Sequence, residues 1–297
     1  MPMHDDQVEV TADTVHRLVE DQFPHWAAMS IEAVPSSATV NAIFRIGDGL
    51  AARLPLRRQD PDDVRSTLQR EAAALAELAE VAPVATPRPV ALGEPGHGYP
   101  MPWSIQAWLP GCDATAEDPG DSDEFADDLA ALIASLRAAG TGGRRFAGRG
   151  RGGHLADHDE WMETCFARSE GLLDVSALRA MWATLRTLPE VEPDAMCHGD
   201  LTPPNVLVRE GRLAGVLDGG DFGPADPALD LVAVWHLLDD VRRESVRRAL
   251  GCDEVQWGRG MAWALQQAMG LVWYYAESNP VMSRWGRRTL QRLESHD

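Results

Sequence analysis

A short polar motif followed by two apolar runs constrains this chain more than any other feature. The motif places Asp200 five positions before Asn205, which directly precedes the apolar run 206–208. A polar turn then leads into a second apolar run, 213–217, which ends at Asp218. Because two apolar runs joined by a short turn are typical of a hairpin, we expect Asn205 and Asp218 at neighbouring strand ends.

The residue types at these three positions suit phosphoryl transfer assisted by Mg²⁺. Asn205 and Asp218 offer hard oxygen ligands, and Mg²⁺ needs few of them from a protein because substrate phosphates supply others. Asp200, on the loop before the hairpin, is a third carboxylate that is free to orient and deprotonate an attacking hydroxyl. We therefore expect a magnesium site at Asn205 and Asp218 and a catalytic base at Asp200.

The same segment resembles the aminoglycoside phosphotransferase family, whose members are small-molecule kinases with the protein-kinase fold. The family pattern is His-Gly-Asp-(Leu/Ile)-x-x-x-Asn, then an apolar strand ending in Ile/Leu-Asp, then Gly-x-x-(Gly/Ala)-Asp-Pro and a further Asp. The matching residues, in the same order and spacing, are His198-Gly199-Asp200-Leu201 with Asn205, Leu217-Asp218, Gly223-Pro224-Ala225-Asp226-Pro227 and Asp230.

The resemblance implies an α+β, bilobal, protein-kinase-like fold. A small N-terminal lobe with an antiparallel sheet, residues 1–110, would bind the nucleotide. A larger, mainly helical C-terminal lobe, residues 111–297, would carry the catalytic and substrate-binding residues. Five segments of this second part have a helical pattern of apolar residues: 122–139, 157–173, 175–188, 230–250 and 254–277.

Roles for the motif residues also follow from the resemblance. Asp200 is the expected catalytic residue, and Asn205 and Asp218 the expected metal ligands. Asp221 is the alternative ligand because it begins an Asp-Phe-Gly triplet like that of protein kinases. Asp218 is preferred since it directly follows the apolar run, whereas Asp221 lies beyond two glycines where the chain is turning.

Three further residues of the motif are expected to support the loop. His198, beside Asp200, is either a second base or, as the resemblance favours, a structural residue whose ring bonds backbone near Asp218. Asp226 and Asp230 are expected to be buried supports that hold loop backbone and nearby helix ends.

The absence of lysine changes the expected nucleotide site. All 27 basic residues are Arg, so Arg53 stands where the family has the strand lysine that contacts the nucleotide phosphates. Arg keeps the charge and offers a planar fork to phosphate oxygens. Glu71, in a run rich in Ala, Leu and Glu, is its expected partner. The resemblance also implies nucleotide contacts from Ser37 and Asn41, in a loop without glycine that could equally be a plain hairpin turn. It implies further contacts at the hinge between the lobes, from Gln106 and Trp108.

The acceptor site is less constrained by the sequence. In the family, acidic side chains of the larger lobe often receive cationic antibiotics. Exposed carboxylates that only interact with solvent are the simpler interpretation of most acidic residues here. The candidates for acceptor contacts are Asp157, Asp159, Glu160, Asp239, Tyr274 and Glu277.

Composition limits the expected partners and location. The chain has 27 basic and 46 acidic residues and a net charge of −19, which disfavours nucleic acid and anionic membranes and suits a cationic small molecule. No apolar run approaches the about 20 residues that span a bilayer, and the N-terminus lacks a signal-peptide pattern. We therefore expect a cytoplasmic protein, as a monomer or a homodimer.

These observations predict a Mg²⁺-dependent phosphotransferase that uses ATP or GTP to phosphorylate a hydroxyl of an aminoglycoside-like antibiotic and so confers resistance. One alternative is a kinase of the same fold that acts on a sugar, amino alcohol or homoserine-like metabolite. Another is a non-catalytic nucleotide- or ligand-binding pseudokinase, which the missing lysine and the glycine-free loop favour. A metal-dependent hydrolase that uses the same carboxylates is the third.

Overall fold

The computed structural model describes residues 8–34, 40–148 and 150–296, which form two compact units. The first is built from Met1–Ala79 and Thr86–Pro110, and the second from Glu80–Ala85 and Gly111–Asp297. The roles expected for residues 1–110 and 111–297, nucleotide binding and catalysis, stay predictions.

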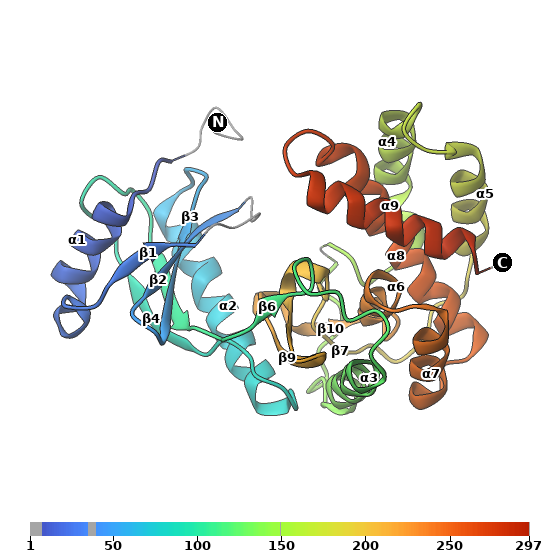
Figure 1. Ribbon diagram of the computed structural model, residues 1–297, viewed down its shortest axis with the longest axis horizontal. Coiled ribbons are helices and arrows are strands. Elements are labelled where there is room, and N and C mark those ends of the chain that lie inside the picture. The colour runs from blue at the N-terminus through green and yellow to red at the C-terminus, as the bar shows by residue number, and fades with distance from the viewer. Residues whose placement is uncertain (1–7, 35–39, 149, 297) are drawn as a thin grey trace. The chain divides into compact units, whose positions relative to one another are not determined.

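The first unit contains a five-stranded antiparallel sheet with the strand order β1-β2-β3-β5-β4 (Figure 1). Its strands are β1 (Ile31–Ala33), β2 (Asn41–Ile46), β3 (Leu50–Pro55), β4 (Pro89–Gly93) and β5 (Trp103–Ala107). Its helices are α1 (Ala12–Gln22), the short 3₁₀ helix η1 (Pro24–Trp26) and α2 (Pro61–Val81), whose last two residues belong to the second unit.

Alternating apolar residues explain how this sheet forms a core. Phe44 and Ile46 of β2 and Leu54 of β3 are buried in one cluster with Leu18 of α1. Thr11 caps the N-terminus of α1, because its Oγ1 accepts a hydrogen bond from the Thr14 N–H at 3.2 Å.

The second unit is mainly helical (Figure 1). Its α-helices are α3 (Asp123–Ala138), α4 (Asp159–Ser169), α5 (Val175–Leu185), α6 (Val232–Leu237), α7 (Asp240–Leu250), α8 (Glu254–Tyr274) and α9 (Pro280–Glu294). Its 3₁₀ helices are η2 (Leu155–His158), η3 (Pro203–Asn205), η4 (Gly219–Asp221) and η5 (Leu229–Leu231). Helix α8 is buried along most of its length. Within the described ranges, no helix is long and apolar enough to cross a bilayer.

Short strands in this unit carry the motif residues. Strands β8 (Val206–Arg209) and β9 (Arg212–Val216) pair in antiparallel register, so the predicted hairpin is confirmed. Strand β6 (Cys112–Asp113) joins them at the edge of β8. Separately, β7 (Ala195–Cys197) pairs with β10 (Gly223–Ala225). The motif therefore leaves β7, turns, and enters β8.

One helix prediction is wrong, and one helix was not predicted. The predicted helix over 230–250 is wrong as one element, because α6 ends at Leu237 and α7 begins at Asp240. The break occurs where the Asp239 carboxylate accepts a hydrogen bond from the Arg242 N–H at 2.9 Å and caps α7. Helix α9 was not expected from the sequence; it begins at Pro280, after Asn279 accepts a hydrogen bond from the Met282 N–H.

Candidate active site

Asp200 lies on the loop between β7 and β8 and is bound by three donors. Its Oδ2 accepts a hydrogen bond from Asn205 Nδ2 at 2.8 Å. Its Oδ1 accepts from Arg151 Nη2 at 2.6 Å and from Gln267 Nε2 at 2.9 Å. The Asp200 side chain remains 38% exposed, so a solvent-borne molecule can still reach it. The loop turns at Gly199, whose φ of 86° lies in the left-handed region that glycine adopts without strain.

Asn205 and Asp218 are brought together by the hairpin, as the pattern of apolar runs predicts. Asn205 ends η3 directly before β8, and its carbonyl accepts a hydrogen bond from the Leu217 N–H at 2.8 Å. Asp218 follows that residue and has φ 59° and ψ 36°, a left-handed conformation that Asp tolerates better than most residues. Such conformations gather at functional sites.

These two side chains suit Mg²⁺. Because Asn205 Nδ2 is turned toward Asp200, the other branch of the amide, Oδ1, faces away as a neutral oxygen ligand. Asp218 is exposed and supplies a carboxylate. No three His, Cys, Asp or Glu side chains among the described residues gather into a metal-binding group. The choice between Asp218 and Asp221 stays a prediction.

Asp230 binds the backbone of the loop that carries Asp200. It is buried, and its two oxygens accept hydrogen bonds from the N–H groups of His198 and Gly199 at 2.8 and 3.0 Å. Burial raises the pKa of this carboxyl, while the two backbone donors and His198 lower it. Asp230 thus fixes the two residues that precede Asp200.

His198 is placed differently from the expectation. Its Nδ1 lies 3.3 Å from the Asp200 backbone nitrogen, which donates to it. Its Nε2 is buried and has no hydrogen-bond partner among the described residues. The expected bond from this ring to backbone near Asp218 is therefore not formed. The ring instead accepts from the backbone at the turn that carries Asp200, and its structural role stays a prediction.

Asp226 supports the site through a buried ion pair. Its Oδ2 accepts hydrogen bonds from Arg259 Nε at 2.8 Å and Trp263 Nε1 at 2.7 Å, both on α8. Its Oδ1 accepts from the Ala228 N–H. The side chains of Asp226 and Arg259 are only 3% and 2% exposed. Asp226 therefore connects the end of β10 and the start of η5 to α8.

Arg151 and Gln267 both donate to Asp200, and neither was expected from the sequence. Arg151 comes from the Gly/Arg-rich segment 140–153, which looks like a plain surface loop in the sequence. The next residue, Gly152, has φ 114°, and a Cβ there would lie 2.7 Å from Ala225 Cβ, so this position needs glycine. Gln267 is a buried polar residue in the apolar part of α8. That contrast was its only signal.

The residues expected to bind the nucleotide lie in the first unit, apart from Ser37, which is outside the described residues. Arg53 is in β3, opposite Ile43 and Ser104, and Glu71 is on α2. Both are half-buried, and their pairing stays a prediction. Asn41 begins β2 and is likewise untested as a phosphate contact.

Two backbone N–H groups of the expected hinge segment have partners in the first unit. The Trp108 N–H donates to the Gly49 carbonyl at 2.9 Å, and the Ala107 N–H to the Arg88 carbonyl at 2.8 Å. Gln106 lies in β5 between β3 and β4. The Trp108 ring lies 5.3 Å from the Arg45 guanidinium. The role of Gln106 and Trp108 as nucleotide contacts stays a prediction.

The acceptor candidates separate into two groups. Asp159 is bound by Arg186 Nε at 2.6 Å and Trp182 Nε1 at 3.0 Å, and Asp239 caps α7. Both carboxylates thus already have partners within the protein, and their role in acceptor binding stays a prediction. The remaining candidates are exposed and stay predictions: Asp157, Glu160, Tyr274 and Glu277.

The sequence matches one family model and several characterised proteins. The model of the phosphotransferase enzyme family matches residues 30–265. Aminoglycoside 3'-phosphotransferase of Streptomyces fradiae is 45% identical over 83 residues, which are 24% of this chain and 31% of that protein. The chain thus matches less than a third of that relative's length.

Solved structures share the fold over nearly the whole chain. The GDP complex of wild-type aminoglycoside 2'-phosphotransferase-IIIa superposes with a TM-score of 0.69 at 17% identity, covering 97% of this chain and 100% of that one. The apoenzyme of macrolide 2'-phosphotransferase MphH from Brachybacterium faecium gives a TM-score of 0.59 at 21% identity, covering 94% and 97%. The expected α+β, kinase-like fold is confirmed by this likeness.

Proposed function

Since this chain belongs to the phosphotransferase enzyme family, we propose that it transfers the terminal phosphoryl group of ATP or GTP to a hydroxyl of an aminoglycoside-like antibiotic. The observation that carries the proposal is the geometry at Asp200, whose Oδ2 is held by Asn205 at 2.8 Å beside the Asp218 turn. A carboxylate next to two further oxygen ligands is the arrangement that phosphoryl transfer to an alcohol needs.

In the proposed reaction, Asp200 orients the acceptor hydroxyl and takes its proton. The hydroxyl oxygen forms a bond to the terminal phosphorus, and the bond from that phosphorus to the diphosphate oxygen breaks, releasing the nucleoside diphosphate. Catalysis of this kind depends mainly on positioning and charge stabilisation. Mg²⁺ held by Asn205 Oδ1 and Asp218 would neutralise charge on the phosphate oxygens.

The nucleotide contacts are proposed for the first unit. Arg53 on β3 supplies the charge that a strand lysine gives other kinase folds, and Glu71 on α2 is its proposed support. The solved complex of a fold neighbour with GDP supports nucleotide use. Both ATP and GTP are present with Mg²⁺ in the cytoplasm, where we place the reaction.

Amino groups make aminoglycosides cationic, and this chain has a net charge of −19. Exposed acidic side chains at the start of α4 and after α8 are the proposed recognition sites for those amines: Asp157, Glu160 and Glu277. Tyr274, which is 42% exposed, is a proposed wall for the sugar rings. The Streptomyces fradiae relative supports an aminoglycoside, and the macrolide enzyme makes macrolides the second class to test.

The proposal is tested by offering the purified protein ATP or GTP with Mg²⁺ and a panel of acceptors. The panel contains aminoglycosides, macrolides, sugars, amino alcohols and homoserine, and mass spectrometry detects an added phosphate. We expect a phosphorylated aminoglycoside. If only a metabolite were phosphorylated, the protein would be a metabolite kinase and not an antibiotic kinase. Nucleotide binding without any phosphorylated product would favour the non-catalytic pseudokinase.

Asp200→Asn is the control for the chemistry. This variant keeps the shape of the side chain but removes the base, so turnover should fall by about 10²–10⁴-fold while nucleotide affinity is unchanged. Near-normal turnover in Asp200→Asn would remove Asp200 from the reaction.

A further inference from the structure

A chain of buried polar side chains leads from Asp200 into the helical interior of the second unit. Gln267 Nε2, on α8, lies 2.9 Å from Asp200 Oδ1. Its Oε1 lies 3.0 Å from His236 Nε2 on α6, and His236 Nδ1 lies 2.7 Å from Thr289 Oγ1 on α9. His236 and Thr289 are fully buried and Gln267 is 8% exposed. Hydrogen bonds in such dry surroundings are strong and costly to leave unmade.

The chemistry of these groups sets the direction of every hydrogen in the chain. An ionised carboxylate only accepts, so Gln267 must present its NH₂ group to Asp200 and its oxygen to His236. The imidazole must then donate from Nε2. Burial lowers the pKa of His236 to about 4, so the ring is neutral near pH 7 and carries one N–H. Its Nδ1 is therefore the acceptor for the Thr289 hydroxyl at 2.7 Å, and that hydroxyl then gives its one hydrogen to the ring in place of the Trp285 carbonyl, which lies farther away at 3.1 Å.

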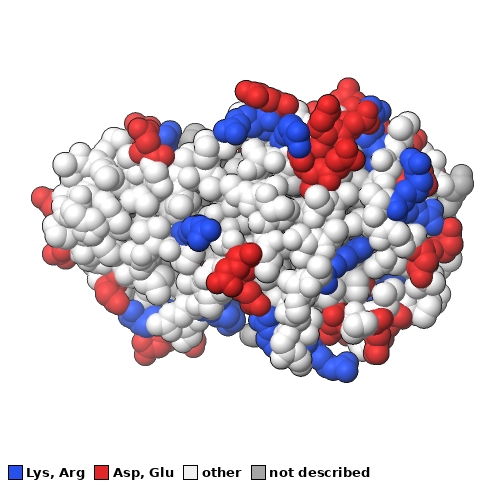
Figure 2. All heavy atoms as spheres, turned by 90° about the horizontal axis from the view of Figure 1, so that it is seen from below, with Lys and Arg blue, Asp and Glu red and all other residues white. Residues whose placement is uncertain are grey.

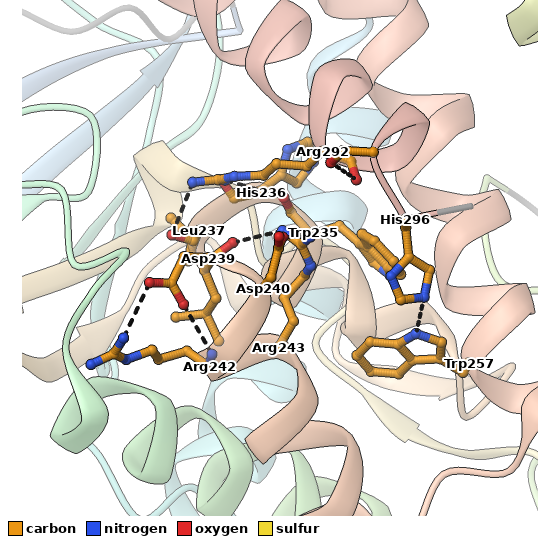
Figure 3. A network of polar contacts seen from close by, with 12 residues as sticks. Trp235, His236, Leu237, Asp239, Asp240, Arg242, Arg243, Trp257, Arg292 and His296 are labelled. Carbon is orange, nitrogen blue, oxygen red and sulfur yellow. Dashed lines mark hydrogen bonds and ion pairs between the residues drawn. The ribbon is translucent and has the colours of Figure 1, made fainter.

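The helix that carries His236 is itself held at its end. Arg292 of α9 donates to the carbonyls of Trp235 at 3.2 Å and Leu237 at 3.4 Å, and to that of His236 between them. Figure 3 shows Arg292 beside the end of α6, next to His236. Burial lowers the pKa of Arg292 to about 10, so it keeps its charge near pH 7. A cation at the C-terminal carbonyls of a helix is stabilising.

Donors are unevenly distributed over the Asp200 carboxylate. Oδ1 receives two hydrogen bonds, from Arg151 at 2.6 Å and Gln267 at 2.9 Å. Oδ2 receives one, from Asn205 at 2.8 Å. A carboxylate oxygen has about two lone-pair sites, so Oδ1 is filled and Oδ2 has one site left.

We propose that Gln267, fixed by the Nε2–H tautomer of His236, is a positioning residue that holds the Asp200 carboxylate with Oδ2 toward the acceptor hydroxyl. The catalytic part of this inference rests on the proposed function, whereas the amide orientation and the tautomer do not. Neither residue touches the substrate; both act through Asp200.

Kinetics of matched variants test the catalytic part. Gln267→Met keeps the length of the side chain and removes the donor, and kcat should fall by about 10–100-fold, since a misplacement of about 1 Å costs as much. The KM for nucleotide and for acceptor should change little. Gln266→Met is the matched control: Gln266 is the preceding residue on α8, is also buried, and faces His158 instead. It should keep the wild-type kcat.

A double-mutant cycle separates positioning from general loss of packing. His236→Leu should lower kcat in the wild-type background and have little further effect in Gln267→Met, because the two residues act in series. Additive effects of the two changes, or a wild-type kcat in Gln267→Met, would overturn the proposal.

Nuclear magnetic resonance of the ¹⁵N-labelled protein tests the geometry without any turnover. The imidazole spectrum should show His236 as the Nε2–H tautomer, and Asp200→Asn should shift the side-chain amide signals of Gln267. An Nδ1–H tautomer would refute the chain of donors, as would Gln267 signals that ignore Asp200→Asn. Should the wild type phosphorylate nothing while the spectra agree, the proposed function fails and the geometry stands.

Discussion

Asn205 combines two roles in one side chain, because its Nδ2 holds Asp200 at 2.8 Å while its oxygen remains for Mg²⁺. We expect Asn205→Ala to raise the Mg²⁺ concentration for half-maximal turnover by about 10-fold or more and to lower kcat. A Mg²⁺ titration of initial rates measures both. Asn279→Ala removes another amide, the cap of α9, and should cost about 1 kcal/mol of stability without changing the Mg²⁺ requirement. An unchanged requirement in Asn205→Ala would exclude Asn205 as a ligand.

His236 makes the stability of the fold depend on pH. Burial lowers its pKa from 6.5 to about 4, so between these values the unfolded chain binds a proton that the folded protein does not. Stability is therefore present above pH 6.5 and is lost as the pH falls toward 4. From about pH 7 to about pH 5, this residue should lower the free energy of unfolding by about 2 kcal/mol.

Urea unfolding at the two pH values measures that loss. His236→Gln should show a smaller loss than the wild type, whereas a variant of the exposed His25, His25→Gln, should keep the wild-type pH dependence. An equal loss of stability in all three proteins would mean that the pKa of His236 is the same in the folded and the unfolded chain.

At the scale of elements, the Asp226–Arg259 pair joins the start of η5 to α8. Asp226→Ala leaves the buried guanidinium of Arg259 without its carboxylate, and the free energy of unfolding should fall by about 3–5 kcal/mol. Glu163→Ala breaks the exposed pair with Arg179 and should cost at most about 1 kcal/mol. Urea unfolding compares the two. Similar losses in both variants would show that burial does not decide the strength of these pairs.

Elements with a local sequence pattern could be predicted, and those set by tertiary contacts could not. The β8–β9 hairpin follows from two apolar runs and a turn, and it brings Asn205 next to Asp218. The break between α6 and α7 depends on one capping carboxylate, Asp239, whose neighbours favour a continuous helix. Gln267 reaches Asp200 across 67 positions of sequence, and no periodicity reports such a contact.

At the scale of the whole molecule, charge is the property that most affects how substrates approach. The chain carries 46 acidic and 27 basic residues. Figure 2 shows Arg side chains beside Asp and Glu side chains on one face, so part of the charge is compensated locally. The net charge of −19 remains as a long-range field that attracts cations and repels anions.

This field predicts that acceptor use depends on ionic strength. Between about 0.02 M and about 0.2 M salt the screening length falls several-fold, and kcat/KM for a polycationic aminoglycoside should fall by about 10-fold. An acceptor with a single amine or none should lose much less, and the KM for the anionic nucleotide should not rise. Initial rates at a fixed Mg²⁺ concentration measure these dependences. If the polycationic and neutral acceptors lost the same factor, salt would act on the protein itself, and electrostatic steering of the substrate would be excluded.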